Sequence, residues 1–199
     1  MAEGTVSLKK KGGTIKFTNT SKKLQNLFKR IARELGYTTK RKDEKNIVIY
    51  STELAKKLLK LCKSFRVKPF KHKDKLIYSP AQLPKEIFKL PKKDIKELLR
   101  IYFSCEGGVV LGKDKRNDEV ILRVCHPKLQ EQIMKLIRLV KIEAKKRGRG
   151  LIYIRKRSEI KKFAKEIRFI DGVRAVRGKH KGVEKNKLLE IVLERHRSV

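Results

Sequence analysis

The sequence is poor in the residues that mark several common classes of protein. It contains three cysteines, at positions 62, 105 and 125, and no pair of them has CxxC spacing. An odd number of scattered cysteines disfavours a disulfide framework or a zinc knuckle, and it indicates buried thiols in a reducing compartment. The four histidines form no HExxH or HxH pattern.

Long apolar runs are also missing. The longest, at residues 47–50 and 151–154, have the length of strands, so we expect no membrane-spanning segment and no membrane partner. The first five residues, Met1 to Thr5, lack the apolar core of a signal peptide. We therefore expect a cytoplasmic protein.

Acidic residues are scarce relative to basic ones. The 199 residues include 55 Lys and Arg against 21 Asp and Glu, which gives a formal net charge of +34. A hydrophobic content of 39% is enough for a packed core, so disorder is not the expected state. This excess of positive charge predicts a polyanionic partner, namely double-stranded DNA with RNA as the alternative.

The dipeptide Glu-Gly occurs twice, at Glu3-Gly4 and Glu106-Gly107, and the same series of predicted elements follows each copy. In the first copy we expect strands at 2–8 and 14–18 around a turn at 11–13, then a helix at 22–35, a strand at 46–50 and a helix at 52–62. In the second copy we expect strands at 105–111 and 119–124, a helix at 127–140, a strand at 151–154 and a helix at 158–167. The common order indicates an internal repeat.

Helix signals also occur between and after the two copies. Pro91 and Gly107 bracket a helix at 92–106 that has one apolar stripe and a second apolar pair, Ile101 and Cys105, on its other side. Ser21 is the expected side-chain cap of the helix at 22–35. Residues 182–197 are predicted to contain a C-terminal docking helix.

The segment Leu99-Arg100-Ile101-Tyr102-Phe103-Ser104-Cys105-Glu106-Gly107-Gly108 resembles the LAGLIDADG motif of homing endonucleases, and Ala2-Glu3-Gly4-Thr5-Val6 resembles the end of a first such motif. The resemblance implies an α+β fold of duplicated modules, each ordered strand-strand-helix-strand-strand-helix. In the family these modules form a saddle of antiparallel sheets with helices on the outer face. The repeats would span residues 1–80 and 81–199.

The resemblance also implies an activity, the Mg²⁺-dependent cleavage of both strands of DNA at a long recognition site. Glu106 and Glu3 would bind Mg²⁺ together with the backbone carbonyls of the residues before them, Cys105 and Ala2. The family places polar and basic residues near the attacking water. The matching positions here are Asn19, Lys23, His126 and Lys128. The family has a further lysine after the last helix of a module, for which Lys68 is the candidate.

The sequence departs from the family pattern at two places. Ile101 stands where the family has a small residue at the crossing of its motif helices, and no helix-length segment precedes Glu3 in the sequence. Three interpretations remain open: a homodimer formed through the helix at 92–106, a truncated start of a pseudo-two-fold monomer, or a lost catalytic site. In the last case the protein would be a non-catalytic DNA or RNA binder, such as a maturase-like helper or a regulator.

Polar and basic residues gather on the two predicted hairpins. Because two-stranded ribbons fit the major groove of DNA, we expect these residues to contact bases or phosphates. They are Thr5, Ser7, Lys9, Lys10, Lys11, Lys16 and Thr18 in the first copy and Lys113, Lys115, Arg116 and Arg123 in the second.

Overall fold

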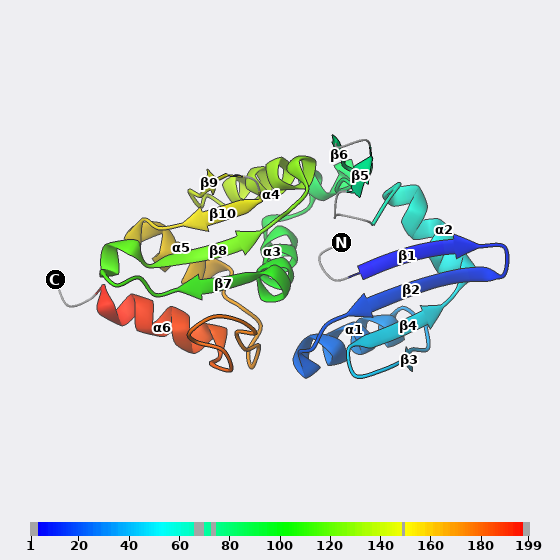
Figure 1. Ribbon diagram of the computed structural model, residues 1–199, viewed down its shortest axis with the longest axis horizontal. Helices are drawn as coiled ribbons and strands as arrows, with labels where there is room; N and C mark the ends of the chain where they lie inside the picture. The colour runs from blue at the N-terminus through cyan, green and yellow to red at the C-terminus, as the bar shows by residue number, and fades with distance from the viewer. Residues whose placement is uncertain (1–3, 66–69, 73–74, 149, 197–199) are drawn as a thin grey trace. The chain divides into compact units, whose positions relative to one another are not determined.

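The structure, a computed structural model, describes residues 4–65, 70–72, 75–148 and 150–196 (Figure 1). The chain divides into two compact units, residues 1–84 and 85–199. In the described ranges, no helix is long and apolar enough to cross a membrane.

The first unit is built on a four-stranded antiparallel sheet in the order β1-β2-β4-β3. Its elements are β1 (Gly4–Lys9), β2 (Gly12–Thr18), α1 (Lys22–Glu34), β3 (Lys40–Arg41), β4 (Asn46–Tyr50) and α2 (Thr52–Leu61). A separate hairpin of β5 (Phe70–His72) and β6 (Lys75–Ile77) follows.

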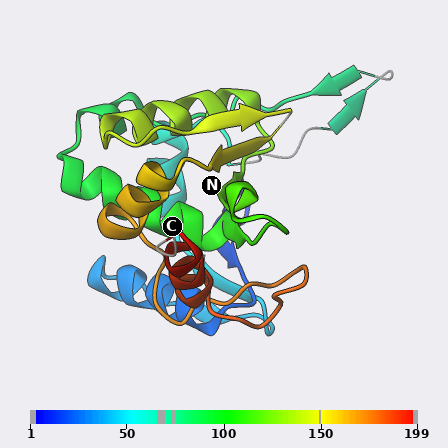
Figure 2. The same ribbon diagram turned by 90° about the vertical axis from the view of Figure 1, so that its left-hand side faces the viewer.

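The second unit contains another four-stranded antiparallel sheet, in the order β7-β8-β10-β9. Its elements are the short helix η1 (Lys85–Lys89), α3 (Lys92–Glu106), β7 (Gly107–Val110), η2 (Lys115–Asn117), β8 (Glu119–Arg123), α4 (Pro127–Leu139), β9 (Lys145–Arg147), β10 (Leu151–Ile154), α5 (Arg157–Glu166) and α6 (Lys185–Arg195). The C-terminal helix α6 faces the viewer in Figure 2.

Both units therefore repeat one topology, in which two hairpin strands lead through a helix to a second antiparallel strand pair and a further helix. This confirms the α+β class and the duplicated modules implied by the family resemblance. The helix at 92–106 and the strands at 46–50 and 151–154 are confirmed with the predicted bounds. The short edge strands β3 and β9 and the β5–β6 hairpin were not predicted from the residues themselves.

Each sheet buries one face against helices. In the first unit Ile15 and Ile49 lie opposite each other in the register and pack with Ala32 of α1 and Ala55 of α2. Phe17 stacks on Phe28 of α1 with a ring-centroid distance of 5.0 Å. Since neighbouring residues of a strand point to opposite faces, the residues between these hydrophobic ones lie on the open face.

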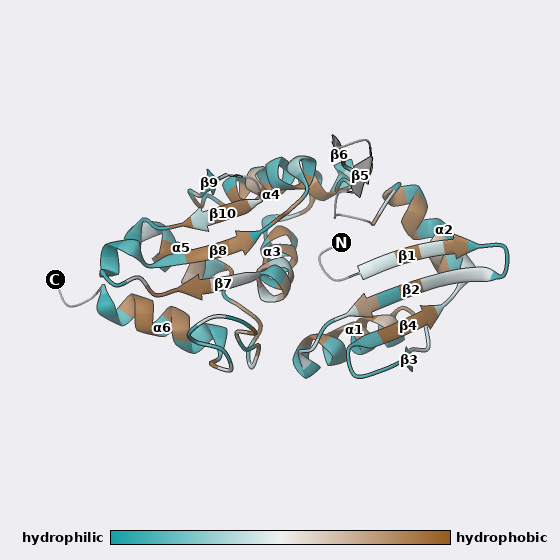
Figure 3. Ribbon diagram, in the orientation of Figure 1, coloured by the Kyte–Doolittle hydropathy of each residue, from teal (hydrophilic) through white to brown (hydrophobic). Residues whose placement is uncertain are grey.

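The second sheet follows the same rule. Val120, Leu122, Ile152 and Ile154 share its covered face and are at most 1% exposed. Figure 3 shows the strongly hydrophobic central strands β4 and β8. Burial of these faces supplies the main stabilisation of each unit.

Two details of the first unit differ from the sequence-based predictions. The hairpin turn consists of Lys10 and Lys11, and Gly12 already begins β2 with a φ of +136°, so the predicted turn at 11–13 was placed too late. Ser21 makes no side-chain cap of α1. Instead, the Asn19 side chain accepts a hydrogen bond from the Ser21 backbone N–H at 2.7 Å and shapes the entry to the helix.

The junction between α3 and β7 requires a glycine. A Cβ atom on Gly107 would lie 2.6 Å from the carbonyl oxygen of Phe103 and 2.9 Å from that of Ile121. A Cβ on the next residue, Gly108, would have no neighbour within 4 Å. The Glu106-Gly107 sequence therefore allows the helix to end directly against the sheet.

We expect Gly107→Ala to destabilise the second unit by about 1–3 kcal/mol, because the new methyl group overlaps backbone atoms that cannot move separately. Gly108→Ala is the matched control, and its effect should stay within about 1 kcal/mol. Urea unfolding measures the change in the free energy of unfolding of both variants. Amide hydrogen exchange in β7 and β8 shows whether the change affects these strands. Equal effects of the two substitutions would contradict this account of the junction.

Candidate functional site

The open face of the first sheet carries most of the predicted contacts of the first copy. The antiparallel register pairs Thr5 with Lys16, Ser7 with Thr14 and Lys9 with Gly12. The Thr18 hydroxyl, also on this face, donates to the Asn46 side chain at 2.6 Å. The structure thus brings Thr5, Ser7, Lys9, Lys16 and Thr18 onto one surface.

The turn beyond this surface extends it with two more basic residues. Lys10 and Lys11 form the β1–β2 turn and are both exposed. Lys40 also joins the surface, because it pairs with Val48, which in turn pairs with Lys16. The open face therefore holds lysines and hydroxyl groups side by side.

In the second unit the predicted contacts fall at separate places. Arg123 lies on the open face of the sheet. It pairs with Leu151 of β10, and Leu151 pairs on its other side with Arg147 of β9. Lys113, Lys115 and Arg116 instead lie in the β7–β8 loop. These three residues are therefore not brought together with Arg123 on the strands.

The β7–β8 loop is braced by a buried carboxylate. Asp118, which is 0% exposed, accepts hydrogen bonds from the Gly112 backbone N–H at 2.9 Å and from Arg195 of α6 at 2.8 Å. Within the loop, the Asp114 carboxylate accepts hydrogen bonds from the backbone N–H and the side chain of Arg116. Hydrogen bonds therefore connect the base of the basic loop to α6.

A cluster that was not predicted lies on the open face of the second sheet. Glu119, the first residue of β8, accepts hydrogen bonds from Arg147 and Arg155, and both guanidinium groups lie over the ring of Tyr153. The hydrogen bond with Glu119 is the main reason that the pKa of the Arg147 guanidinium is raised. The cluster combines one acid with two bases and an aromatic ring.

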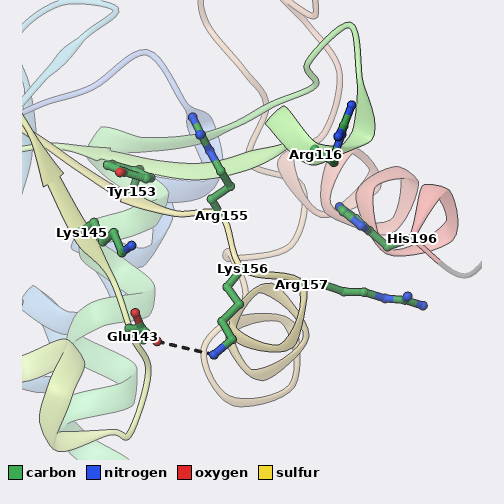
Figure 4. Close-up of a pocket in the computed structure, with 8 residues that line it drawn as sticks. All are labelled: Arg116, Glu143, Lys145, Tyr153, Arg155, Lys156, Arg157 and His196. Atoms are coloured by element: carbon green, nitrogen blue, oxygen red, sulfur yellow. Dashed lines mark ion pairs between the residues drawn. The ribbon is translucent and has the colours of Figure 1, made fainter.

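Next to this cluster is a cavity of about 530 Å³ that is lined mainly by basic side chains (Figure 4). Its lining residues are Arg116, Glu143, Lys145, Tyr153, Arg155, Lys156, Arg157 and His196. Glu143 makes an ion pair with Lys156 at 3.8 Å. The composition suits an anionic ligand.

Glu106 ends α3, the helix that resembles the LAGLIDADG motif. Burial, and next the nearby Glu106 carboxylate, raise the pKa of the Tyr102 phenol. A carboxylate at the carbonyl end of a helix is electrostatically unfavourable, so a cation is expected near this helix end.

Lys185 of α6 supplies a cation at the end of α3. Its side chain is buried, and its ammonium donates hydrogen bonds to the carbonyl oxygens of Ser104 at 2.7 Å and Gly107 at 2.6 Å. It also lies 5.6 Å from the ring centroid of Phe169. Lys185 therefore compensates the negative end of the α3 dipole.

The implied Mg²⁺ can be tested against this arrangement. Mg²⁺ needs several oxygen ligands in a near-octahedral arrangement. Within the described parts of the chain, no group of three or more His, Cys, Asp or Glu side chains could hold a metal ion. The ammonium of Lys185 binds the carbonyls on both sides of Cys105 and Glu106, and it would repel a second cation there. The described residues at the end of α3 therefore do not make a Mg²⁺ site by themselves, and Glu3, the other expected acid, lies outside the described residues.

The predicted polar and basic residues near the attacking water lie at equivalent strand-to-helix junctions. Asn19 shapes the β2–α1 junction, and His126 caps α4 by accepting a hydrogen bond at Nδ1 from the Leu129 N–H at 3.4 Å. Lys23 and Lys128 are exposed in the first turns of α1 and α4. Glu3, Ala2 and Lys68 lie outside the described residues.

Sequence reasoning missed Lys185, Glu119, Arg147, Arg155 and Tyr153 as site residues. Glu119 did carry a signal, because glutamate is depleted in strands and this one begins a hydrophobic strand. Lys185 carried none, because its partners Ser104 and Gly107 are about eighty positions earlier in the chain.

Among the comparisons with known proteins, a family model supports the LAGLIDADG resemblance in the first part of the chain. A search of curated proteins finds no match. One solved structure that is similar to this chain is "The homing endonuclease I-WcaI bound to its DNA recognition sequence". It has 16% sequence identity and a TM-score of 0.42, over 86% of this chain and 80% of that chain. Residues 1–65 match the family model of the LAGLIDADG-like domain. The LAGLIDADG resemblance is thereby confirmed for residues 1–65, which are similar to the LAGLIDADG-like domain.

Proposed function

We propose that the protein binds double-stranded DNA through the open faces of its two sheets. The observation that carries this proposal is the register of the first sheet, which places Thr5, Ser7, Lys9, Lys16 and Thr18 on the face opposite the helices. Lysines contact phosphates, and hydroxyl groups donate to or accept from base edges.

The charge of the strands supports this proposal. The described strands β1 to β4 contain Lys9, Lys16, Lys40 and Arg41 and no acidic residue. In the whole sequence basic residues outnumber acidic ones by 55 to 21. A surface of this kind attracts a polyanion and releases its counterions on binding.

We expect the affinity for duplex DNA to fall by roughly 10³ to 10⁵ between about 50 and 200 mM salt, as is typical for about 6–10 phosphate contacts. Fluorescence anisotropy with a labelled duplex measures this dependence. Replacing Lys16 by Ala should reduce the logarithmic salt slope by about 1, since one phosphate contact is lost. Lys57→Ala, on the exposed side of α2, is the control and should leave the slope unchanged. An affinity that does not change with salt would exclude the proposal.

DNA hydrolysis is a second candidate function. The position of Glu106 favours it, because α3 ends at this carboxylate immediately before β7. The match of residues 1–65 to the LAGLIDADG-like domain gives further support. Cleavage with Mg²⁺, as the resemblance implies, would require a second acid beside Glu106. Glu3, the residue expected in that role, lies outside the described residues.

Replacing Glu106 by Gln separates binding from hydrolysis. We expect this variant to bind DNA as tightly as the wild type or more tightly, because one negative charge that faces phosphate is removed. It should also lose any nicking of a plasmid library in the presence of Mg²⁺ or Mn²⁺. The control is Glu97→Gln, an exposed change on the same helix, which should keep both properties. Nicking that persists in Glu106→Gln would rule out Glu106 as a catalytic residue.

A further inference from the structure

The open face of the second sheet holds an acidic residue on a surface that we expect to contact DNA. Glu119 points to the side opposite Val120 and Leu122, which are buried against the helices. Its side chain is nevertheless only 5% exposed, because Arg147 and Arg155 cover it. An acid at this position would repel phosphate if it had no other role.

The two arginines reach Glu119 from separate positions of the sheet. Arg147, the last residue of β9, makes a forked contact, with Nη2 at 2.6 Å from Oε1 and Nη1 at 3.3 Å from Oε2. Arg155 follows β10 and donates from Nε to Oε1 at 2.7 Å. One carboxylate therefore fixes both guanidinium groups.

The ring of Tyr153 supports the same two groups from below. The guanidinium carbon of Arg147 lies 4.4 Å from the ring centroid, and that of Arg155 lies 5.5 Å from it. Figure 4 shows Arg155 and Tyr153 in the wall of the basic cavity. Each guanidinium is thus held at an edge by Glu119 and at a face by Tyr153.

The arrangement orders the arginine side chains before any ligand arrives. A long side chain loses conformational freedom when it is fixed, and here that loss occurs during folding and not during binding. Arg147 and Arg155 remain 49% and 43% exposed, so they can still be reached from solvent. A guanidinium also has more N–H donors than its contact with one carboxylate uses.

We propose that Glu119 is a positioning residue that holds Arg147 and Arg155 for contact with a two-acceptor group of duplex DNA. Such a group is either a phosphate or the O6 and N7 atoms of a guanine in the major groove. This inference rests on the proposed DNA binding of the chain. Net charge alone would disfavour Glu119 on a DNA-binding face, whereas positioning of the two arginines explains why an acid stands there.

The substitution Glu119→Gln distinguishes positioning from charge by the sign of its effect. If only charge mattered, removal of one negative charge would strengthen DNA binding. If Glu119 positions the arginines, binding should weaken by about tenfold although the protein becomes more positive. Fluorescence anisotropy with a duplex that the wild type selects from a random pool measures the change, and circular dichroism checks folding. Binding that is equal or tighter in this variant would overturn the proposal.

A second test replaces each arginine by lysine, which keeps both the net charge of the protein and the buried Glu119. Arg147→Lys and Arg155→Lys keep the positive charge but lose the planar fork, so each should weaken binding by about tenfold. If the ligand group is a guanine, selection from a random pool should show a relaxed preference at one position. If it is a phosphate, the loss should be uniform across sequences. Affinity that is unchanged in both lysine variants would also overturn the proposal.

Two control variants accompany these tests. Arg168→Lys makes the same exchange in an exposed ion pair with Glu190, and Glu97→Gln removes an exposed acid of the same unit. The first should leave affinity unchanged, and the second should leave it unchanged or slightly increased. If the wild type does not bind duplex DNA at all, the proposed function fails together with this inference. If the wild type binds and the Glu119, Arg147 and Arg155 variants bind equally well, only the inference fails.

Discussion

The one-sided burial of each sheet is the constraint on which the other features of this protein depend. Because side chains alternate along a strand, packing Ile15 and Ile49 against α1 and α2 forces their neighbours to the opposite face. A register shift by one residue would bury Lys16 and expose Ile15. The hydrophobic core therefore determines which residues lie on the open face. In the first sheet these include the hydroxyl groups of Thr5, Ser7 and Thr18 and the ammonium groups of Lys9 and Lys16.

The end of α3 shows how a buried lysine compensates the negative end of a helix dipole. A cation near this helix end is favoured by both the helix dipole and the Glu106 carboxylate. The buried ammonium of Lys185 is such a cation, and it donates hydrogen bonds to the carbonyls of Ser104 and Gly107. The same region is joined to the rest of the unit, since the Ile170 N–H donates to the Ser104 hydroxyl at 2.8 Å. Asn186, next to Lys185, exchanges hydrogen bonds with the backbone of Phe169. This helix end is thus part of the folded framework of the second unit.

The sequence predicted features whose causes are local. The strands at 46–50 and 151–154 and the helix at 92–106 were predicted with correct bounds, because hydrophobic periodicity and the flanking Pro91 and Gly107 determine them. The grouping of Thr5, Ser7 and Lys16 also follows from alternation once the hairpin is recognised.

The features that sequence reasoning missed depend on contacts between distant residues. Strands β3 and β9 are too short to show a period, and they exist because β4 and β10 offer an edge for pairing. Glu119 meets Arg147 and Arg155 only after β8, β10 and β9 have assembled. The β1–β2 turn was placed too late because Gly12 and Gly13 suggest a turn, whereas Gly13 serves the packing of α2. A Cβ there would lie 2.6 Å from that of Ala55.

The brace between Asp118 and Arg195 makes the two hairpins unequal. The first hairpin ends in a short turn of two exposed lysines, while the loop of the second is tied at its base to the last helix. The side chain that holds the base of the second loop therefore comes from α6, more than seventy residues later in the chain. A sequence change at Arg195 would therefore act on the β7–β8 loop through Asp118 and the Gly112 backbone, although α6 follows the loop at a distance in the sequence.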